Sequence, residues 1–241
     1  MKKSTLKEIA GKLKEAETIL LYPHVIMDGD TLGSSIALCA ALRKIGKKAH
    51  ILIEDAIPSY LFFLEKGYCT YDQNIIETPD ISMSVDCSDI ERFVKRKDKF
   101  LTGKSSICID HHRTNNYFAE LNYIDEHAGA VGEIVYDLIR AMGIELDVEM
   151  AEAIYTAIST DTGNFQYTNT TKTTHLITAE LFDAGIDLEK ISVEVYQNTR
   201  YEKLKILNEV ISTIEVFSGG KADIAYVTQE MLEKTGAIME E

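Results

Sequence analysis

Four segments of this 241-residue chain each end in histidine or aspartate side chains. The clearest is the apolar run 106–109, which is followed directly by Asp110, His111 and His112. The other three segments deliver, in chain order, His24 with Asp28 and Asp30, then Asp86, and finally Asp161. In an open α/β sheet, the strand ends on one edge surround a single crevice. The pattern therefore favours a fold in which several element ends meet and bring these side chains together.

Strand-like and helix-like segments alternate over the first two-thirds of the chain. Short apolar runs predict strands, and helical spacing predicts helices between them. The expected strands are 18–21, 48–53, 81–85 and 106–109, and the expected helices are 32–45, 58–65, 130–142 and 148–159. This alternation is typical of a parallel sheet with helices on both faces. We therefore expect an α/β domain over 1–186 that holds the metal-binding and catalytic groups.

The pattern changes after residue 170. It predicts helices over 171–183, 188–196 and 201–208, a hairpin of strands 210–217 and 222–227, and a helix over 229–235. We interpret 187–208 as a helical linker and 209–241 as the beginning of a second α/β domain. A hairpin and one helix do not bury a core alone, so we expect this second domain to be truncated.

Composition limits the kind of partner. The net charge is −14, from 25 basic and 39 acidic residues, which argues against binding long duplex nucleic acid. It does not exclude a small phosphorylated substrate, because two divalent ions in an aspartate-rich site reverse the local field. The sequence lacks a run of roughly 18 apolar residues, so no membrane association is expected. The four widely spaced cysteines are typical of buried thiols in a reducing cytoplasm.

The donor types indicate a metal site. Histidine and aspartate without cysteine suit Mn²⁺ or Mg²⁺ better than Zn²⁺. Asp28 and Asp30 are two positions apart, so in an extended loop they could serve different ions, although both could instead cap the helix that begins near Thr31. A two-metal site needs a bridging carboxylate, and Asp86 is our candidate for it. Taken alone, Asp86 and Asp161 would each read as turn residues.

Two adjacent histidines follow a buried strand, and their side chains can have different functions. One imidazole can bind a metal while the other faces the substrate as a cation or hydrogen-bond donor. Asp110 can fix the tautomer of an imidazole from behind. The alternative is that His111 and His112 are ordinary surface residues.

In this order, the residues resemble the DHH phosphoesterase superfamily, and most closely its cytoplasmic oligoribonuclease branch. Members of that branch also act as phosphatases on 3′-phosphoadenosine 5′-phosphate (pAp). The resemblance rests on four stretches: DHHRTN at 110–115, NYID at 122–125, GEIVYD at 132–137 and TDTGNFQYTNTT at 160–171. It covers essentially the whole chain.

The resemblance implies a ligand set. One ion, expected to be Mn²⁺ with Mg²⁺ or Co²⁺ as alternatives, would be held by His24, Asp28 and Asp86. A second would be held by Asp30, Asp86, His111 and Asp161. His112 would contact the scissile phosphate, and Arg113 is a further candidate for substrate binding.

Two features depart from the family pattern. Met27 stands where the family usually has proline, which would affect loop stiffness more than ligation. The second domain of the family, called DHHA1, carries a Gly-Gly-Gly-His motif that grips the substrate, and no such motif precedes Glu241. We interpret this difference as truncation of a DHHA1-like domain rather than true loss.

The expected function is hydrolysis of very short RNA, especially dinucleotides, or of pAp, by a metal-activated water in the cytoplasm. One alternative is a phosphodiesterase for cyclic or linear dinucleotides. Another is a metal- or nucleotide-binding module without turnover. The sequence leaves open whether the protein forms a homodimer.

Overall fold

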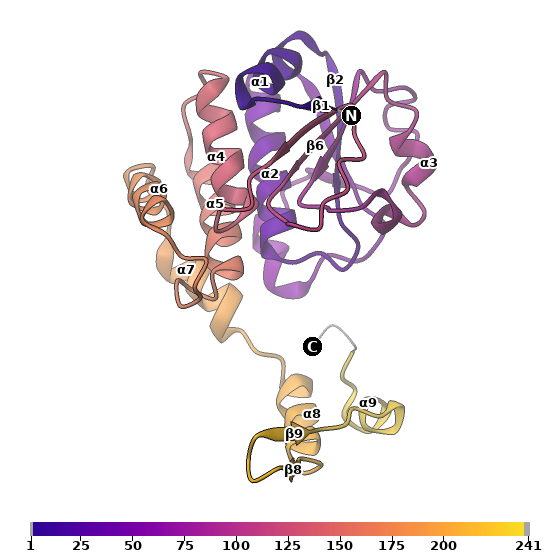
Figure 1. The fold of residues 1–241 in the computed structure, drawn as a ribbon, viewed down its shortest axis with the longest axis vertical. Helices are drawn as coiled ribbons and strands as arrows, with labels where there is room; N and C mark the ends of the chain where they lie inside the picture. Colours follow the sequence, from indigo (N-terminus) through magenta and orange to yellow (C-terminus); the bar gives the residue numbers. More distant parts are fainter. Residues whose placement is uncertain (1, 239–241) are drawn as a thin grey trace. The chain divides into compact units, whose positions relative to one another are not determined.

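The computed structural model describes residues 2–238, which form two compact units (Figure 1). The first, here called unit 1, ends at Ile191, and unit 2 begins at Ser192. The domain boundaries expected from the sequence, at residues 186 and 208, stay predictions.

Unit 1 is built on a seven-stranded sheet in which every paired strand is parallel. The strand order is β1-β7-β6-β5-β2-β3-β4. The central strands are β2 (Thr18–Pro23), β5 (Ile81–Val85) and β6 (Ser105–Asp110), flanked by β3 (Lys48–Leu52) and β7 (Leu121–Ile124). Two-residue strands, β1 (Lys2–Lys3) and β4 (Cys69–Thr70), form the edges. The parallel α/β sheet expected from the sequence is confirmed.

Helices cover both faces of the sheet (Figure 1). On one side lie α1 (Leu6–Glu15), α2 (Gly29–Lys44), α4 (Val131–Ala141) and α5 (Val148–Asp161), with α6 (Lys172–Asp183) packed against α5. The opposite face is covered by the short helices η2 (Ile90–Phe93) and α3 (Lys97–Phe100). Side chains alternate along a strand, so Leu20 and Tyr22 of β2 share this face with Phe93 and Phe100. The remaining helices of unit 1 are η1 (Ser59–Leu64) and α7 (Leu188–Ser192), the last residue of which falls in unit 2.

Helices α2, α4 and α5 approach one another closely through small residues. A Cβ atom added at Gly33 would lie 2.5 Å from the carbonyl oxygen of Ala153, and one at Gly132 would lie 2.8 Å from the Cβ of Ala157. A Cβ at Gly29 would lie 2.4 Å from Thr160 Oγ1. This packing brings the beginning of α2 beside the end of α5.

Unit 2 contains η3 (Val193–Gln197), α8 (Tyr201–Ile211), β8 (Glu215–Phe217), β9 (Ala222–Ile224) and α9 (Gln229–Thr235). Strands β8 and β9 pair antiparallel, as the predicted hairpin requires. The predicted strand start at residue 210 was wrong. Ile206 and Val210 are one helical turn apart and pack with Leu232 of α9, so burial keeps Val210 in the helix despite its preference for strands.

The four cysteines are free thiols, and Cys39, Cys87 and Cys108 are buried while Cys69 is half-buried. Burial raises the pKa of each thiol, which disfavours the reactive thiolate. Among residues 2–238, no helix is both long and apolar enough to cross a bilayer.

Candidate metal centre

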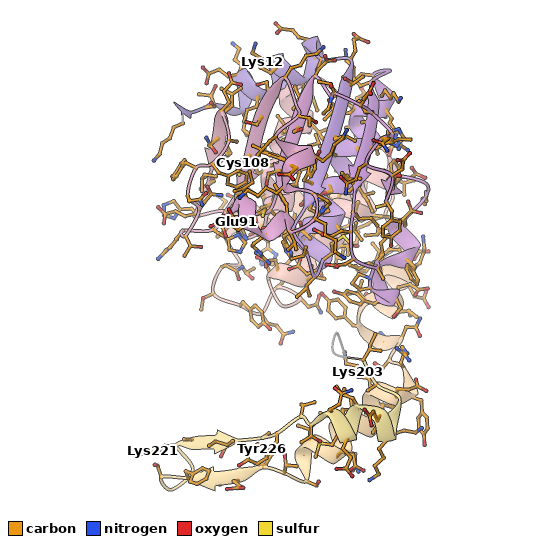
Figure 2. The ribbon with its side chains drawn as sticks, turned by 90° about the vertical axis from the view of Figure 1, so that its right-hand side faces the viewer. Lys12, Glu91, Cys108, Lys203, Lys221 and Tyr226 are labelled. Atoms are coloured by element: carbon orange, nitrogen blue, oxygen red, sulfur yellow. The ribbon has the colours of Figure 1, made fainter. Side chains whose placement is uncertain are left out.

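The candidate ligands come from three neighbouring strand ends and two helix ends. His24 follows β2, Asp86 follows β5, and His111 follows β6, and these strands are adjacent in the sheet. Asp28 and Asp30 lie at the start of α2, and Asp161 is the last residue of α5. Figure 2 shows Lys12 of α1 near one end of the strands and Glu91, which lies beyond β5, toward the other. The site lies at the carboxyl edge of the sheet, as the sequence pattern predicted.

The first group of donors is His24, Asp28 and Asp86. His24 Nε2 lies 3.6 Å from a carboxylate oxygen of Asp28 and 3.6 Å from Asp86 Oδ2. The other ring nitrogen, Nδ1, lies 2.6 Å from the carbonyl oxygen of Val25. Since a carbonyl only accepts, Nδ1 carries the proton and donates, which leaves Nε2 free to bind a cation when the ring is neutral.

The second group is Asp30, His111 and Asp161. His111 Nε2 lies 3.9 Å from Asp30 Oδ2 and 3.7 Å from Asp161 Oδ2. His111 Nδ1 lies 3.0 Å from the carbonyl oxygen of Ala128, so it donates there as His24 does to Val25. Both imidazoles therefore present the same ring nitrogen to the carboxylates, held in place by the backbone.

Asp86 joins the two groups. Its Oδ2 faces His24, and its Oδ1 lies 3.8 Å from His111 Nε2. Oδ1 is buried and has no hydrogen-bond partner among the described residues. The backbone of Asp86 has φ 56°, a left-handed conformation that costs energy for an aspartate and is often found at functional sites. An orphaned buried carboxylate oxygen fits a missing cation.

The distances support this fit. Separations of 3.6 to 3.9 Å are too long for hydrogen bonds between these atoms. Donors that each sit about 2.1 Å from one small cation are themselves about 3 Å or slightly more apart. A modest contraction around an ion in each group would therefore satisfy the donors.

Charge repulsion among the carboxylates is large. Burial, followed by the charges of Asp86 and Asp161, raises the pKa of Asp30 well above its usual value. Burial and the neighbouring carboxylates raise the pKa of Asp161 to about 6, although His111 opposes the shift. Burial would lower the pKa of His24, but the neighbouring carboxylates of Asp28 and Asp86 outweigh it and raise that pKa to about 9. Cations bound among these carboxylates would relieve the same repulsion.

The start of α4 holds Asp30 in place. The backbone N–H groups of Val131 and Gly132 donate to its carboxylate at 2.7 and 3.0 Å, and the Ser34 hydroxyl donates at 3.0 Å. Asp28 also caps α2, since it accepts the N–H of Thr31 at 3.0 Å. The two sequence interpretations of Asp28, as a cap and as a metal donor, are thus compatible because each uses a different oxygen.

Asp110 lies behind the metal centre and is fully buried. One carboxylate oxygen accepts from His112 Nδ1 at 2.7 Å, and the other accepts from Asn115 Nδ2 at 2.7 Å. The hydrogen bond that His112 donates to Asp110 raises the pKa of His112. His112 Nδ1 lies 3.4 Å from Asp86 Oδ1, and the side chain is 40% exposed, so it is accessible to a ligand.

Two residues near the site were not predicted. Asn115 holds Asp110 through a turn closed by its own N–H to the carbonyl of His112, at 3.1 Å. Asn169 donates to the carbonyl oxygens of Gly129 and Asp161 at 2.9 and 3.1 Å. Both lie in the stretches that carry the family resemblance, which is the signal that could have indicated them. Taken alone, an asparagine side chain at either position does not indicate a metal site.

Arg113 does not join the candidate centre. Its side chain is 77% exposed and its Nε lies 3.2 Å from a carboxylate oxygen of Glu126. Its role in substrate binding stays a prediction. Met27, which replaces the usual proline, is buried.

Comparison with known proteins gives a consistent picture. The sequence model of the "DHH family, N-terminal domain" matches residues 18–158. The "Bifunctional oligoribonuclease and PAP phosphatase NrnA" of Thermus thermophilus is 32% identical over 236 residues, which cover 96% of this chain and 69% of that protein. The Bacillus subtilis protein of the same name is 26% identical, over 97% of this chain and 74% of that one.

A solved structure is also similar. An exopolyphosphatase-related protein from Bacteroides fragilis superposes with a TM-score of 0.90 at 26% identity. The match covers 97% of this chain and 72% of that one.

Proposed function

The chain belongs to the DHH family, and from this premise we propose a two-metal phosphoesterase that cleaves RNA dinucleotides or pAp. A nuclease or phosphatase activity follows from the family and from the relatives with that name. The metal requirement and the substrates are the further steps of the proposal.

The observation that carries the proposal is the position of Asp86 between two groups of donors. Its two oxygens face different histidines, as a carboxylate shared by two ions does. His24, Asp28 and Asp86 would hold one ion, and Asp30, Asp86, His111 and Asp161 the other. The oxygen-rich donor set suits Mn²⁺, with Mg²⁺ and Co²⁺ as alternatives.

When bound, two such ions would supply an activated water and would neutralise charge on the phosphate. The residues of the chain do the positioning. The carbonyls of Val25 and Ala128 fix the two imidazole tautomers, and the start of α4 fixes Asp30. Asp110 raises the pKa of His112, which favours the protonated ring that can donate to the phosphate oxygen on which charge develops.

The substrate class is taken from the named activities of the relatives and from charge. A net charge of −14 disfavours a long polyanion, whereas one or two phosphates can be accommodated at a site that holds two divalent ions.

The test uses the purified chain, depleted of metal and then supplied with Mn²⁺. We expect nucleoside monophosphates to be released from a linear RNA dinucleotide, or inorganic phosphate from pAp, and calorimetry to find two ions per chain. Asp86→Asn should abolish turnover and reduce the number of ions bound. Two bound ions without hydrolysis of either substrate, or of a cyclic dinucleotide, would identify a binding module instead.

A further inference from the structure

A pocket of about 390 Å³ lies beyond the metal centre, at the ends of β3 and β4. Its lining includes Phe62, Tyr71, Ile53, Ile57 and Glu65. We propose that this pocket binds a nucleobase of the substrate while the attached phosphate lies at the metal centre. This inference rests on the proposed function and names the part of the chain that recognises the base.

The pocket lies at the same edge of the sheet as the metal donors. His24 follows β2, Ile53 follows β3, and Tyr71 follows β4, and these three strands are adjacent and parallel. Neighbouring strands are about 4.8 Å apart, so β4 lies roughly 10 Å from β2. His24 is the strand-end donor nearest the pocket, so a nucleotide whose phosphate lies at the ion that His24 would hold can extend its base toward β3 and β4.

Asp55 connects the two places directly. Its carboxylate accepts the N–H of Ile26, which lies in the loop between His24 and Asp28, at 3.0 Å. Its carbonyl oxygen accepts the hydroxyl of Tyr71 at 3.3 Å. The loop that carries two metal donors and the ring that lines the pocket are therefore bonded to the same residue.

A buried arginine reinforces this connection. The Arg96 guanidinium donates to the carbonyl oxygens of Pro23 and Leu52, the last residues of β2 and β3, at 2.9 and 2.6 Å. It also donates to Glu54, the residue before Asp55, at 3.0 Å. The ends of the two strands are thus held at a fixed separation, so the pocket keeps its distance from the metal donors.

The lining suits a base and not a phosphate. Phe62 and Tyr71 are 58% and 61% exposed, so their rings are accessible to a ligand. Exposed rings of this kind are surfaces on which bases stack. Ile53 and Ile57 add apolar lining, and the Glu65 carboxylate would repel a phosphate group.

The experiment compares two substrates and matched ring deletions. Tyr71→Leu and Phe62→Leu remove a ring, whereas Tyr71→Phe keeps the ring and loses only the hydroxyl. The control is Phe182→Leu, the same change at a 47% exposed phenylalanine of α6, away from the strand ends. The substrates are an RNA dinucleotide and an abasic dinucleotide with the same sugar-phosphate backbone.

We expect Tyr71→Leu and Phe62→Leu each to raise KM for the RNA dinucleotide about tenfold, because one stacking surface is lost. Their activity on the abasic dinucleotide should fall much less than their activity on the RNA dinucleotide, and Tyr71→Phe, which keeps the ring, should impair the RNA dinucleotide less than Tyr71→Leu does. Phe182→Leu should leave both substrates unaffected. The proposal is overturned if both ring deletions behave like Phe182→Leu, or if they impair the abasic substrate as strongly as the RNA dinucleotide.

A binding measurement separates this proposal from the proposed function. Adenosine 5′-monophosphate is titrated into wild type and Tyr71→Leu by calorimetry in the presence of Mn²⁺. About tenfold weaker binding by the variant supports the base pocket even if no substrate is hydrolysed. Equal binding, or no binding by the wild type, rejects the pocket whatever the outcome of the activity assays.

Discussion

At the scale of single residues, Asp86 shows how a site is built at the expense of stability. It combines a left-handed backbone conformation with a buried oxygen that no described residue satisfies. Both features are unfavourable in a protein that only needs to fold, since strain and orphaned polar atoms each cost free energy. Their coincidence at one carboxylate between two histidines is the reason that we propose a pair of ions here.

The two adjacent histidines should respond differently to truncation. His111→Ala removes a donor with its Nε2 among three carboxylates, so it should weaken binding of Mn²⁺. His112→Ala should keep both ions and lower kcat by ~10²–10³, the usual effect of deleting a donor that stabilises transition-state charge. Calorimetric titration with Mn²⁺ and steady-state kinetics measure the two effects.

His50→Ala serves as the control for both, because His50 lies in β3 outside the groups of candidate donors. Loss of an ion in His112→Ala together with its retention in His111→Ala would reverse the assignment.

The sequence pattern indicated the candidate donors more readily than the residues that hold them in place. Asp30 and Asp86 stand where elements begin or end, which a linear pattern reveals. The partners of Asp110 and Asp161 depend instead on turns and on contacts between distant segments, as for Asn169, which bonds to Gly129. An asparagine has no spacing rule that marks such a role. Arg113 pairs with Glu126 at the surface, and its role in substrate binding stays a prediction.

At the scale of secondary-structure elements, Asp80 holds the amino ends of several strands together, at the edge of the sheet opposite the candidate metal donors. It precedes β5, and its carboxylate accepts the N–H groups of Glu17 and Thr18, at the start of β2, at 3.0 Å each. Lys104, just before β6, lies 2.8 Å from its other oxygen. One side chain thus aligns the beginnings of three neighbouring strands.

Asp80→Asn should destabilise the fold in a pH-dependent manner. The Lys104 ammonium and the two backbone N–H groups hold the pKa of Asp80 below its usual value of 3.8, although burial opposes them. A lowered pKa in the folded state means that the charge stabilises the fold above pH 3.8 and that this contribution fades as pH falls through the folded-state pKa. Urea unfolding should show a loss of about 1–2 kcal/mol at pH 7.

The difference between wild type and Asp80→Asn should shrink at pH 3 and below. Asp98→Asn, a change at an exposed aspartate of α3, is the control and should have little effect at any pH. A difference for Asp80→Asn that is the same at pH 7 and pH 3 would contradict the linkage.

The central strands and helices could be predicted because the hydrophobic pattern of their sequence matches the residues that are buried. The run 81–85 forms β5 in full, and the helix expected over 229–235 has those bounds. The edge strands β1 and β4 were missed, because two residues carry no periodicity. Val210 was misplaced because contact with α9 decides its conformation, and that contact is invisible in a local window.

At the scale of the whole molecule, the candidate centre should make stability depend on metal. Several carboxylates meet in a chain of net charge −14, so the metal-free protein carries unrelieved repulsion. Ions that bind only the folded state add about 2.7 kcal/mol at a hundred times their dissociation constant. For a chain of this size we expect Mn²⁺ to raise Tm by roughly 5–10 °C.

The variant Asp86→Asn tests this expectation, with Tm measured by differential scanning calorimetry in the absence and presence of Mn²⁺. Without metal its Tm should equal or exceed that of the wild type, because the change removes a buried charge beside other carboxylates. Addition of Mn²⁺ should raise the Tm of Asp86→Asn much less than that of the wild type. As a control, NaCl at equal ionic strength should not reproduce the increase in Tm of either protein. The same increase in both proteins would place the stabilising ions elsewhere.

The close approach of α2, α4 and α5 has a consequence for how sequence variation in this protein should be interpreted. At Gly33 and Gly132 there is no room for even one methyl group, because backbone or Cβ atoms of α5 occupy that space. A saturation screen would therefore score these glycines as intolerant as His111 or Asp86, although they touch no reacting group. Intolerance in this part of the chain identifies helices whose backbones touch as well as side chains that react. Only a measurement that separates folded yield from turnover distinguishes the two.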